Sequence, residues 1–119
     1  HPRYLYAWET GRAIAKQLTK QDRILLVDPS SNGQYMVIMR YNLQPTTTIH
    51  SEVTAAHRPT SAGLAKRASA DKVTHVWLYD PTPMIKQAFN LDLAGGRSWL
   101  LAKQTGKWTP VANWPHPRR

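Results

Sequence analysis

The sequence predicts an α/β domain, in which helices alternate with the strands of a mainly parallel sheet. One short, continuous apolar run, residues 23–28, has the length of a strand and lacks polar alternation, as strands buried on both faces do. A second run, residues 73–79, has the composition of a strand as well. Segments with helical spacing of apolar residues separate these runs. At the end of the chain, two strand-like segments flank a glycine-containing turn, which indicates an antiparallel hairpin.

The first element is expected to be an amphipathic helix from Tyr4 to Lys20. Gly11 falls on its apolar stripe, where a missing side chain allows close packing. Arg12, Lys16 and Lys20 are expected to face outward. The residues of the expected core-facing stripe are Tyr4, Trp8, Gly11, Ile14, Ala15 and Leu18.

Residues 23–28 are expected to form the central strand, and residues 34–43 after it allow two interpretations. Asn32-Gly33 is a strong signal for a hairpin turn, which would make the segment a strand. Ser31 and Gln34 instead form the capping box of a helix. We favour the helix, because the segment lacks polar alternation and a helix completes a βαβ unit.

The remaining elements follow in the same alternation. We expect a second strand at residues 46–50, a helix at 59–70 and a third strand at 73–79. Thr82 is expected to cap a short helix at residues 84–89.

A hairpin over residues 97–114 completes the sheet, and Pro110, which has no N–H, is expected in an edge strand. Right-handed crossovers place the first strand between the second and the third. The expected fold is therefore a three-layer, Rossmann-like α/β sheet with central parallel strands in the order 2-1-3, extended by the antiparallel hairpin. We expect one domain over residues 1–119, with an N-terminal helix in 1–22 and a βαβαβα core in 23–90.

The composition points to anionic partners. The chain carries 16 Lys and Arg residues against 7 Asp and Glu, a net charge of +9, which favours nucleic acid, lipid head groups, phosphosugars or acidic glycans. The absence of cysteine excludes disulfides, thiol catalysis and cysteine-based zinc sites. No apolar stretch reaches the ~20 residues of a membrane span. Because the chain begins with His1 instead of Met, we expect a fragment or a processed chain, with any membrane segment upstream.

Candidate ligand-binding residues lie where the strands of the expected parallel sheet end. Ligands of open α/β sheets bind beyond the carboxyl ends of the strands, where the strand order reverses. The residues expected at this edge are Asp28, Ser30, Ser31, Asn32, Gly33, Asp80 and Thr82. Amides at a helix start can hold an anion there, and the two aspartates can bind a cation. The alternative is structural, because Asp-Pro ends strands and Ser-Asn-Gly forms turns in many proteins.

The sequence offers little for metal binding or catalysis. His50, Glu52 and His57 form the cluster most similar to a metal site, but their spacing matches no recognised zinc motif. We therefore predict no metal and no cofactor. No nucleophile elbow is present, so we predict no catalytic residue in this chain. His75 is expected to be a structural histidine of its strand.

The tryptophans allow two interpretations. Trp99, Trp108 and Trp114 lie on the hairpin, where exposed rings can stack on sugars or nucleobases. More often, such residues attach the hairpin to the sheet or to a neighbouring domain, and we favour this structural role. Trp8 and Trp77 are expected in the core.

The order of several segments is similar to that in one known family. The segments that carry the similarity are a helix with Trp8 and Arg12, the strand 23–28, Asn32-Gly33-Gln34-Tyr35 leading into Arg40-Tyr41-Asn42-Leu43, the strand 73–78, and a tryptophan-rich hairpin ending in Trp114-Pro115. This order resembles the extracytoplasmic C-terminal domains of polytopic GT-C type glycosyltransferases, which use dolichyl- or polyprenyl-phosphate sugars. The catalytic acids of that family lie in loops of the membrane region, so the resemblance assigns no catalytic residue here.

The resemblance implies a non-catalytic accessory domain on the periplasmic or extracellular side of the bacterial inner membrane. It implies contact with lipid-linked sugar, glycan, the membrane surface or a partner, and a transmembrane region upstream in the same chain. Two other functions stay open from the residues alone: a basic nucleic-acid-binding domain, and a small stand-alone α/β protein that binds anions.

Overall fold

The computed structural model describes residues 2–28, 34–50, 61–70, 72–92 and 98–115. The elements in chain order are α1 (Pro2–Ala15), β1 (Arg23–Val27), α2 (Gln34–Leu43), β2 (Thr47–His50), α3 (Ser61–Ala70), β3 (His75–Tyr79), α4 (Pro83–Ala88), β4 (Ser98–Gln104) and β5 (Lys107–Trp114). The predicted α/β class is confirmed. The helix favoured for residues 34–43 is also confirmed, against the alternative of a hairpin strand.

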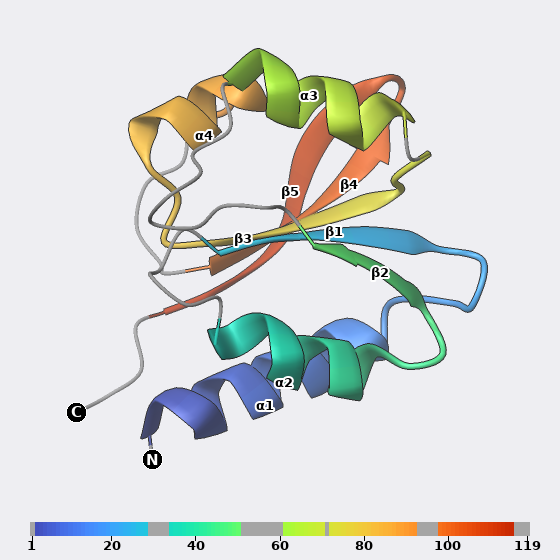
Figure 1. Cartoon of the computed structure of the whole chain (residues 1–119), viewed down its shortest axis with the longest axis vertical. Helices are drawn as coiled ribbons and strands as arrows, with labels where there is room; N and C mark the ends of the chain where they lie inside the picture. The colour runs from blue at the N-terminus through green and yellow to red at the C-terminus, as the bar shows by residue number, and fades with distance from the viewer. Residues whose placement is uncertain (1, 29–33, 51–60, 71, 93–97, 116–119) are drawn as a thin grey trace.

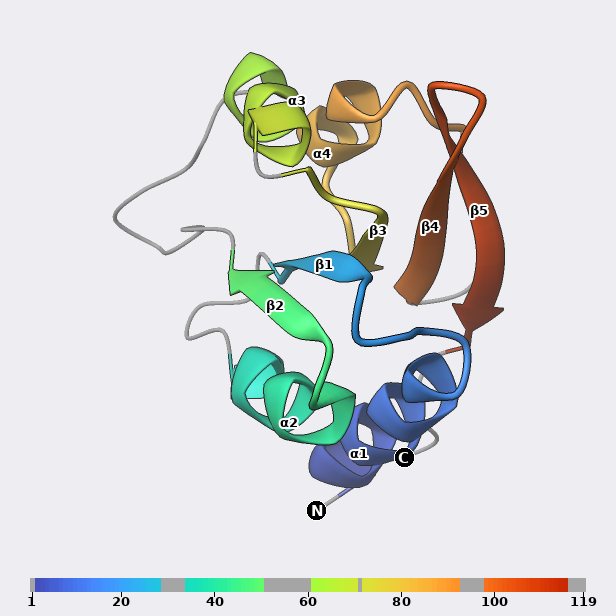
Figure 2. The same cartoon turned by 90° about the vertical axis from the view of Figure 1, so that its right-hand side faces the viewer.

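The strands form one mixed, five-stranded sheet in the order β2-β1-β3-β4-β5. β1 lies between β2 and β3 and runs parallel to both, whereas β3, β4 and β5 pair antiparallel in succession. Helices α1 and α2 cover one face of the sheet and α3 and α4 cover the other, which gives three layers (Figures 1 and 2). Across the described residues, no helix combines the length and the apolar composition of a membrane span.

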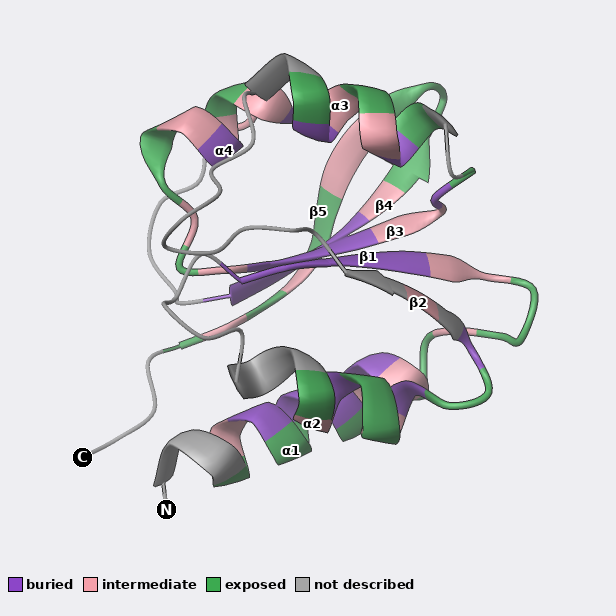
Figure 3. Ribbon diagram, in the orientation of Figure 1, coloured by how far each residue is buried: buried purple, intermediate pink, exposed green. Residues whose placement is uncertain are grey.

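The central strand is buried on both faces, which explains its unbroken apolar sequence. Ile24, Leu25, Leu26 and Val27 each have 0% of their surface exposed. Leu25 and Val27 pack on the α3/α4 side of the sheet, and Ile24 and Leu26 pack on the α1/α2 side. Burial of one such side chain contributes roughly 1.5–3 kcal/mol. Figure 3 shows the same pattern for the whole chain, with buried residues on the sheet and on the helix surfaces turned toward it.

Helix α1 differs from expectation in where it ends. It stops at Ala15 and does not continue to Lys20. Asp22 Oδ2 accepts hydrogen bonds from the Thr19 backbone N–H (2.8 Å) and from the Thr19 hydroxyl (3.4 Å). Such local side-chain hydrogen bonds compete with helical ones, so they favour a turn before β1.

The buried stripe of α1 is also rotated relative to the expected one. It consists of Ala7, Thr10, Gly11 and Ile14, all of which are buried. Trp8 lies beside this stripe and is 40% exposed, so its assignment to the core was wrong. A polar residue, Thr10, occupies a position that an apolar periodicity alone does not identify.

Gly11 is confirmed as the point of close approach between α1 and α2. A Cβ atom placed on Gly11 would lie 3.0 Å from Asn42 Cβ and 3.3 Å from Met39 Sδ. Both distances are shorter than ordinary van der Waals contact between such atoms. The absent side chain therefore sets the separation of the two helices.

The hairpin turn and a bulge define the last two strands. Thr105 (φ 50°) and Gly106 (φ 77°) form a two-residue turn of the kind that hairpins favour. Leu100 pairs with Ala112 but Leu101 pairs with Pro110, so Val111 is an extra residue in β5. β5 forms one edge of the sheet, which confirms the placement of Pro110 in an edge strand.

Replacement of Gly11 by valine is expected to lower the free energy of unfolding by about 1–3 kcal/mol, because the new side chain would overlap Asn42 and Met39. Urea denaturation followed by circular dichroism measures the change. Glu9→Val, at an exposed site of the same helix, controls for the intrinsic helix propensity of valine. Equal urea midpoints for the two variants would contradict the close approach at Gly11.

Candidate functional site

The carboxyl edge of the parallel strands holds the predicted ligand-binding residues. Asp28 follows β1 and is fully buried, whereas Asp80 follows β3 and is exposed. Val27 pairs with Leu78, so Asp28 is level with Tyr79 and one residue short of Asp80. The structure thus brings the two aspartates to neighbouring strand ends but gives them different access to solvent. Ser30, Ser31, Asn32 and Gly33 lie outside the described residues.

Thr82 has a structural role at this edge. Its hydroxyl accepts a hydrogen bond from the Ile85 backbone N–H at 3.3 Å, which makes Thr82 the N-cap of α4, as predicted. Asp80 adopts a positive φ of 45°, a conformation that aspartate tolerates better than most residues. The chain therefore turns sharply between β3 and α4 through residues suited to a turn.

The His50, Glu52 and His57 cluster, considered above as a metal site, lies outside the side chains that the structure describes. Among the described residues, no group of three or more His, Cys, Asp or Glu side chains could hold a metal ion.

The three hairpin tryptophans do not form one stacking surface. Trp99 is only 7% exposed and belongs to the core on the α3/α4 side, so its proposed role in glycan stacking does not fit the structure. Trp108 packs on that same side, and Trp114 packs on the α1/α2 side. The two residues are an even number of positions apart and would share a face in a regular strand. The bulge at Val111 shifts the alternation and separates them.

Trp108 is held by contacts within the domain. Its ring meets Phe89 edge to face, with centroids 5.9 Å apart. The Lys103 ammonium lies 5.8 Å from the centre of the Trp108 ring, within range of a cation–π interaction. These contacts support the structural interpretation, in which the hairpin tryptophans attach the hairpin to the rest of the sheet.

An exposed aromatic surface lies on the outer side of α1 and α2. The rings of Trp8 and Tyr41 stack across the two helices, with centroids 5.5 Å apart and planes inclined by 29°. Leu5 and Val37 lie one helical turn before them. We call these four residues the aromatic face; the exposed fractions are 59% for Leu5, 40% for Trp8, 70% for Val37 and 64% for Tyr41.

The sequence contains a signal for the aromatic face that apolar periodicity alone does not reveal. In α2, Met39 and Leu43 are buried, whereas Val37 and Tyr41, each two positions before one of them in the sequence, are exposed. Two steps along a helix turn the side chain by about 200°, so the two pairs lie on opposite sides of α2. A helix in a surface layer can bury only the side that faces the sheet. When apolar residues lie on two opposite sides of such a helix, those on the outer side are exposed.

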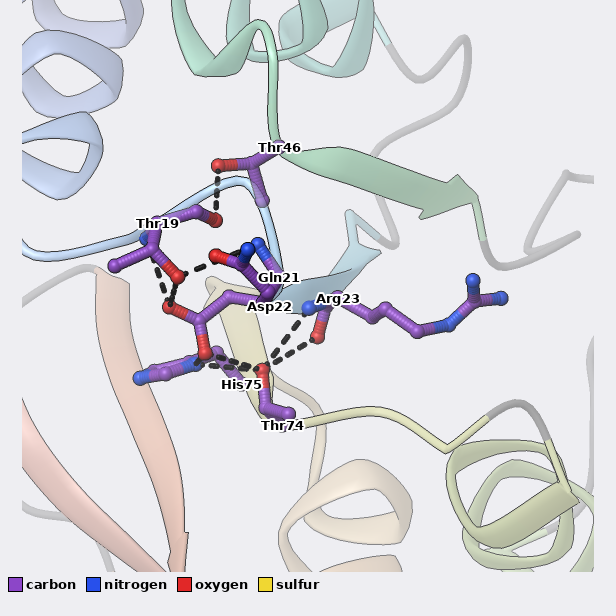
Figure 4. Close-up of polar contacts among 7 residues, drawn as sticks. All are labelled: Thr19, Gln21, Asp22, Arg23, Thr46, Thr74 and His75. Carbon is purple, nitrogen blue, oxygen red and sulfur yellow. Dashed lines mark hydrogen bonds and ion pairs between the residues drawn. The ribbon is translucent and has the colours of Figure 1, made fainter.

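A polar cluster joins the start of β1 to the start of β3, at the opposite end of the sheet from Asp28 and Asp80 (Figure 4). Thr74 Oγ1 accepts a hydrogen bond from the Arg23 N–H at 3.0 Å. It also lies 3.1 Å from Asp22 Oδ1 and 2.9 Å from His75 Nδ1. A neutral His75 with its proton on Nδ1 can donate to Thr74, whose hydroxyl then donates to Asp22. This is the structural histidine expected from the sequence.

The cluster shifts the pKa values of both titratable members. Burial raises the pKa of Asp22, but hydrogen bonds from Thr19 and Thr74 and the nearby His75 outweigh it and hold that pKa below 3.8. Burial lowers the pKa of His75 below 6.5, although Asp22, at 3.6 Å, favours the charged ring. The folded state therefore prefers a charged Asp22 and a neutral His75.

Comparison of the chain with protein-family models, with curated proteins and with solved structures gives no match. The chemistry of the described residues therefore carries the functional argument.

The His75 cluster predicts a loss of stability in mild acid. Because the folded pKa of His75 is lower than 6.5, the unfolded chain binds more protons below that pH and is favoured there. Stability is fully present above about pH 6.5 and falls as the pH decreases through the folded pKa. Asp22 adds a second loss below 3.8. In the variant His75→Gln, the free energy of unfolding is expected to fall less as the pH decreases below about 6.5, as measured by urea titrations at a series of pH values. If the free energy of unfolding depends on pH in the same way in the variant and in the wild type, His75 is not the cause of the loss.

Proposed function

We propose that this chain is a non-catalytic accessory domain of a membrane glycosyltransferase or glycan-assembly protein, located on the extracytoplasmic side of the membrane. In this role it contacts the anionic membrane surface, lipid-linked sugar, glycan or a partner. The observation that carries the proposal is the net charge of +9 on 119 residues. Each Lys or Arg held near an anionic membrane contributes about 1 kcal/mol to binding.

The distribution of charge supports a broad electrostatic contact. Exposed cations occur on several elements, including Arg12 and Arg40 on the α1/α2 layer, Lys66 on α3, and Lys103 and Lys107 on the hairpin. A spread of this kind suits an extended anionic surface better than a single small anion. The resemblance to the terminal domains of GT-C type glycosyltransferases adds the glycan-assembly context.

The finer fold class belongs to the same proposal. The parallel arrangement of β2, β1 and β3 supports a Rossmann-like sheet. In such sheets the carboxyl edge is the usual ligand position, and here it carries Asp28 and Asp80. A lipid-linked phosphosugar at this edge would meet the exposed Asp80 carboxylate, since Asp28 is buried, so the cations elsewhere on the domain must supply its attraction.

Binding to vesicles that contain anionic phospholipid is expected to weaken steeply as the salt concentration rises from about 0.1 M to about 1 M, because the screening length falls from ~10 Å to ~3 Å. Co-sedimentation with the vesicles measures the bound fraction. Vesicles of neutral phosphatidylcholine are the control and should bind far less protein. Equal binding to both kinds of vesicle, or none to either, would refute the proposal.

A single-stranded oligonucleotide tests the competing function. The charge of the chain also suits nucleic acid, whose binding depends on salt in a similar way. Tighter binding of the oligonucleotide than of anionic vesicles at the same salt concentration, with quenching of tryptophan fluorescence, would favour a nucleic-acid-binding domain instead.

A further inference from the structure

The aromatic face is the most apolar exposed surface on the helices of the described chain. Among the residues whose side chains the structure describes, four of the five exposed large hydrophobic ones, Leu5, Trp8, Val37 and Tyr41, lie on α1 and α2. The fifth, Val111, is the bulge residue of β5. Contiguous apolar residues at a surface mark contacts with another molecule more often than scattered ones do.

These side chains are not needed to hold α1 and α2 on the sheet. The buried residues Ala7 and Ile14 of α1, and Met39 and Leu43 of α2, belong to the core on this side. The residues of the aromatic face are exposed instead of belonging to that core. The two helices lie side by side in one outer layer (Figures 1 and 2). The exposed residues are therefore free to make contacts outside the domain.

Cations surround the aromatic face. Arg12 follows Trp8 by one helical turn, Arg40 precedes Tyr41, and Lys16 follows the end of α1; all three are exposed. Glu9 is the one exposed acidic residue described on these two helices. Long basic side chains can keep their charge at the level of lipid phosphates while nearby apolar groups enter deeper.

The combination of side chains fits the boundary of a membrane. Tryptophan and tyrosine concentrate at the level of lipid head groups, where one end of the ring system meets water and the other meets acyl chains. Helices that lie on a membrane carry apolar and aromatic residues on one side and Lys or Arg beside them. Trp8 and Tyr41 with Arg12 and Arg40 meet both requirements.

A second copy of the chain fits this surface less well. A symmetric dimer places the same patch against itself, so Arg12, Lys16 and Arg40 of one copy would approach those of the other. Each copy also carries a net charge of +9. An anionic lipid surface has the opposite charge and no such repulsion.

We infer that the aromatic face is a docking surface for anionic lipid bilayers, with Leu5, Trp8, Val37 and Tyr41 entering the head-group region and Arg12 and Arg40 contacting lipid phosphates. This inference rests on the proposed function and names the part of the domain that meets the membrane. Electrostatic attraction brings the domain to the surface, and the aromatic face fixes its orientation there.

The test replaces apolar groups without changing charge. A triple variant with Trp8→Gln, Val37→Ser and Tyr41→Gln keeps the net charge of +9 and alters only exposed positions. Val111→Ser removes an exposed apolar side chain of β5, outside the aromatic face, and is the matched control. Circular dichroism and urea denaturation establish whether each variant is folded. If the triple variant is not folded, the single variant Val37→Ser is tested in its place.

The wild-type chain and the Val111→Ser control are expected to bind anionic vesicles equally. The triple variant is expected to bind about tenfold more weakly or worse, because the apolar contribution is lost. Lipids brominated near the head group should quench wild-type fluorescence, and Trp8→Phe should remove part of that quenching.

The other outcomes separate the inference from the proposed function. Undiminished binding of the triple variant, with equal quenching in the Trp8→Phe variant, would overturn the aromatic face as the docking surface but leave the electrostatic proposal standing. Absence of wild-type binding would overturn both. A wild-type dimer in sedimentation that the triple variant abolishes would assign the surface to a second copy of the chain.

Discussion

The fold depends on the burial of β1 and β3 from both sides. Strands that carry consecutive apolar side chains on both faces, such as residues 24–27 and 76–78, cannot leave either face in water, so helices must cover both faces of the sheet. The residues of β1 divide between the two cores, with Leu25 and Val27 on one side and Ile24 and Leu26 on the other. β3 repeats this division, since Val76 and Leu78 face α3 and α4 while Trp77 faces α1 and α2. The three layers follow from this single requirement.

The ends of the two buried strands then acquire different chemistry. At one end, Asp22, Thr74 and His75 satisfy each other with hydrogen bonds and connect β1 to β3. At the other end, Asp28 is buried and Asp80 is exposed beyond a sharp turn. The first end is a stabilising cluster, and the second is the edge at which α/β sheets usually meet ligands. The first end also carries exposed cations, Lys20, Lys72 and Lys103, and the Lys103 backbone N–H donates to the Thr74 carbonyl at 3.1 Å.

Elements with strong local signals could be predicted from the sequence. The buried strands, the capping of α4 by Thr82, and the edge position of Pro110 all follow from short-range rules that the structure confirms. The features that were missed depend on contacts between distant residues. The turn after α1 is held by Thr19 and Asp22, and the Thr46 hydroxyl, just before the neighbouring strand β2, donates to the Thr19 carbonyl at 3.1 Å.

The candidate surfaces were harder to predict for the same reason. One bulge residue, Val111, sends Trp108 and Trp114 to opposite faces. Pro110 beside it is typical of both edge strands and bulges, so it does not by itself predict the change of phase. Trp8 was expected in the core because it falls on the apolar stripe of the expected helix, three residues before Gly11. Thr10 and Gly11 instead occupy the packed positions, so Trp8 is displaced to the outer surface.

The close approach at Gly11 has a consequence beyond packing. A cross-helix ring pair such as Trp8 and Tyr41 can stay stacked only while the two helices remain near each other, and Gly11 lies one turn from Trp8 along α1. The short distance between α1 and α2 that Gly11 permits therefore also determines how the exposed Trp8 and Tyr41 rings stack. The chain has five tryptophans, so the part of the emission that Trp8→Phe removes is the part that reports the separation of α1 and α2, without any added label.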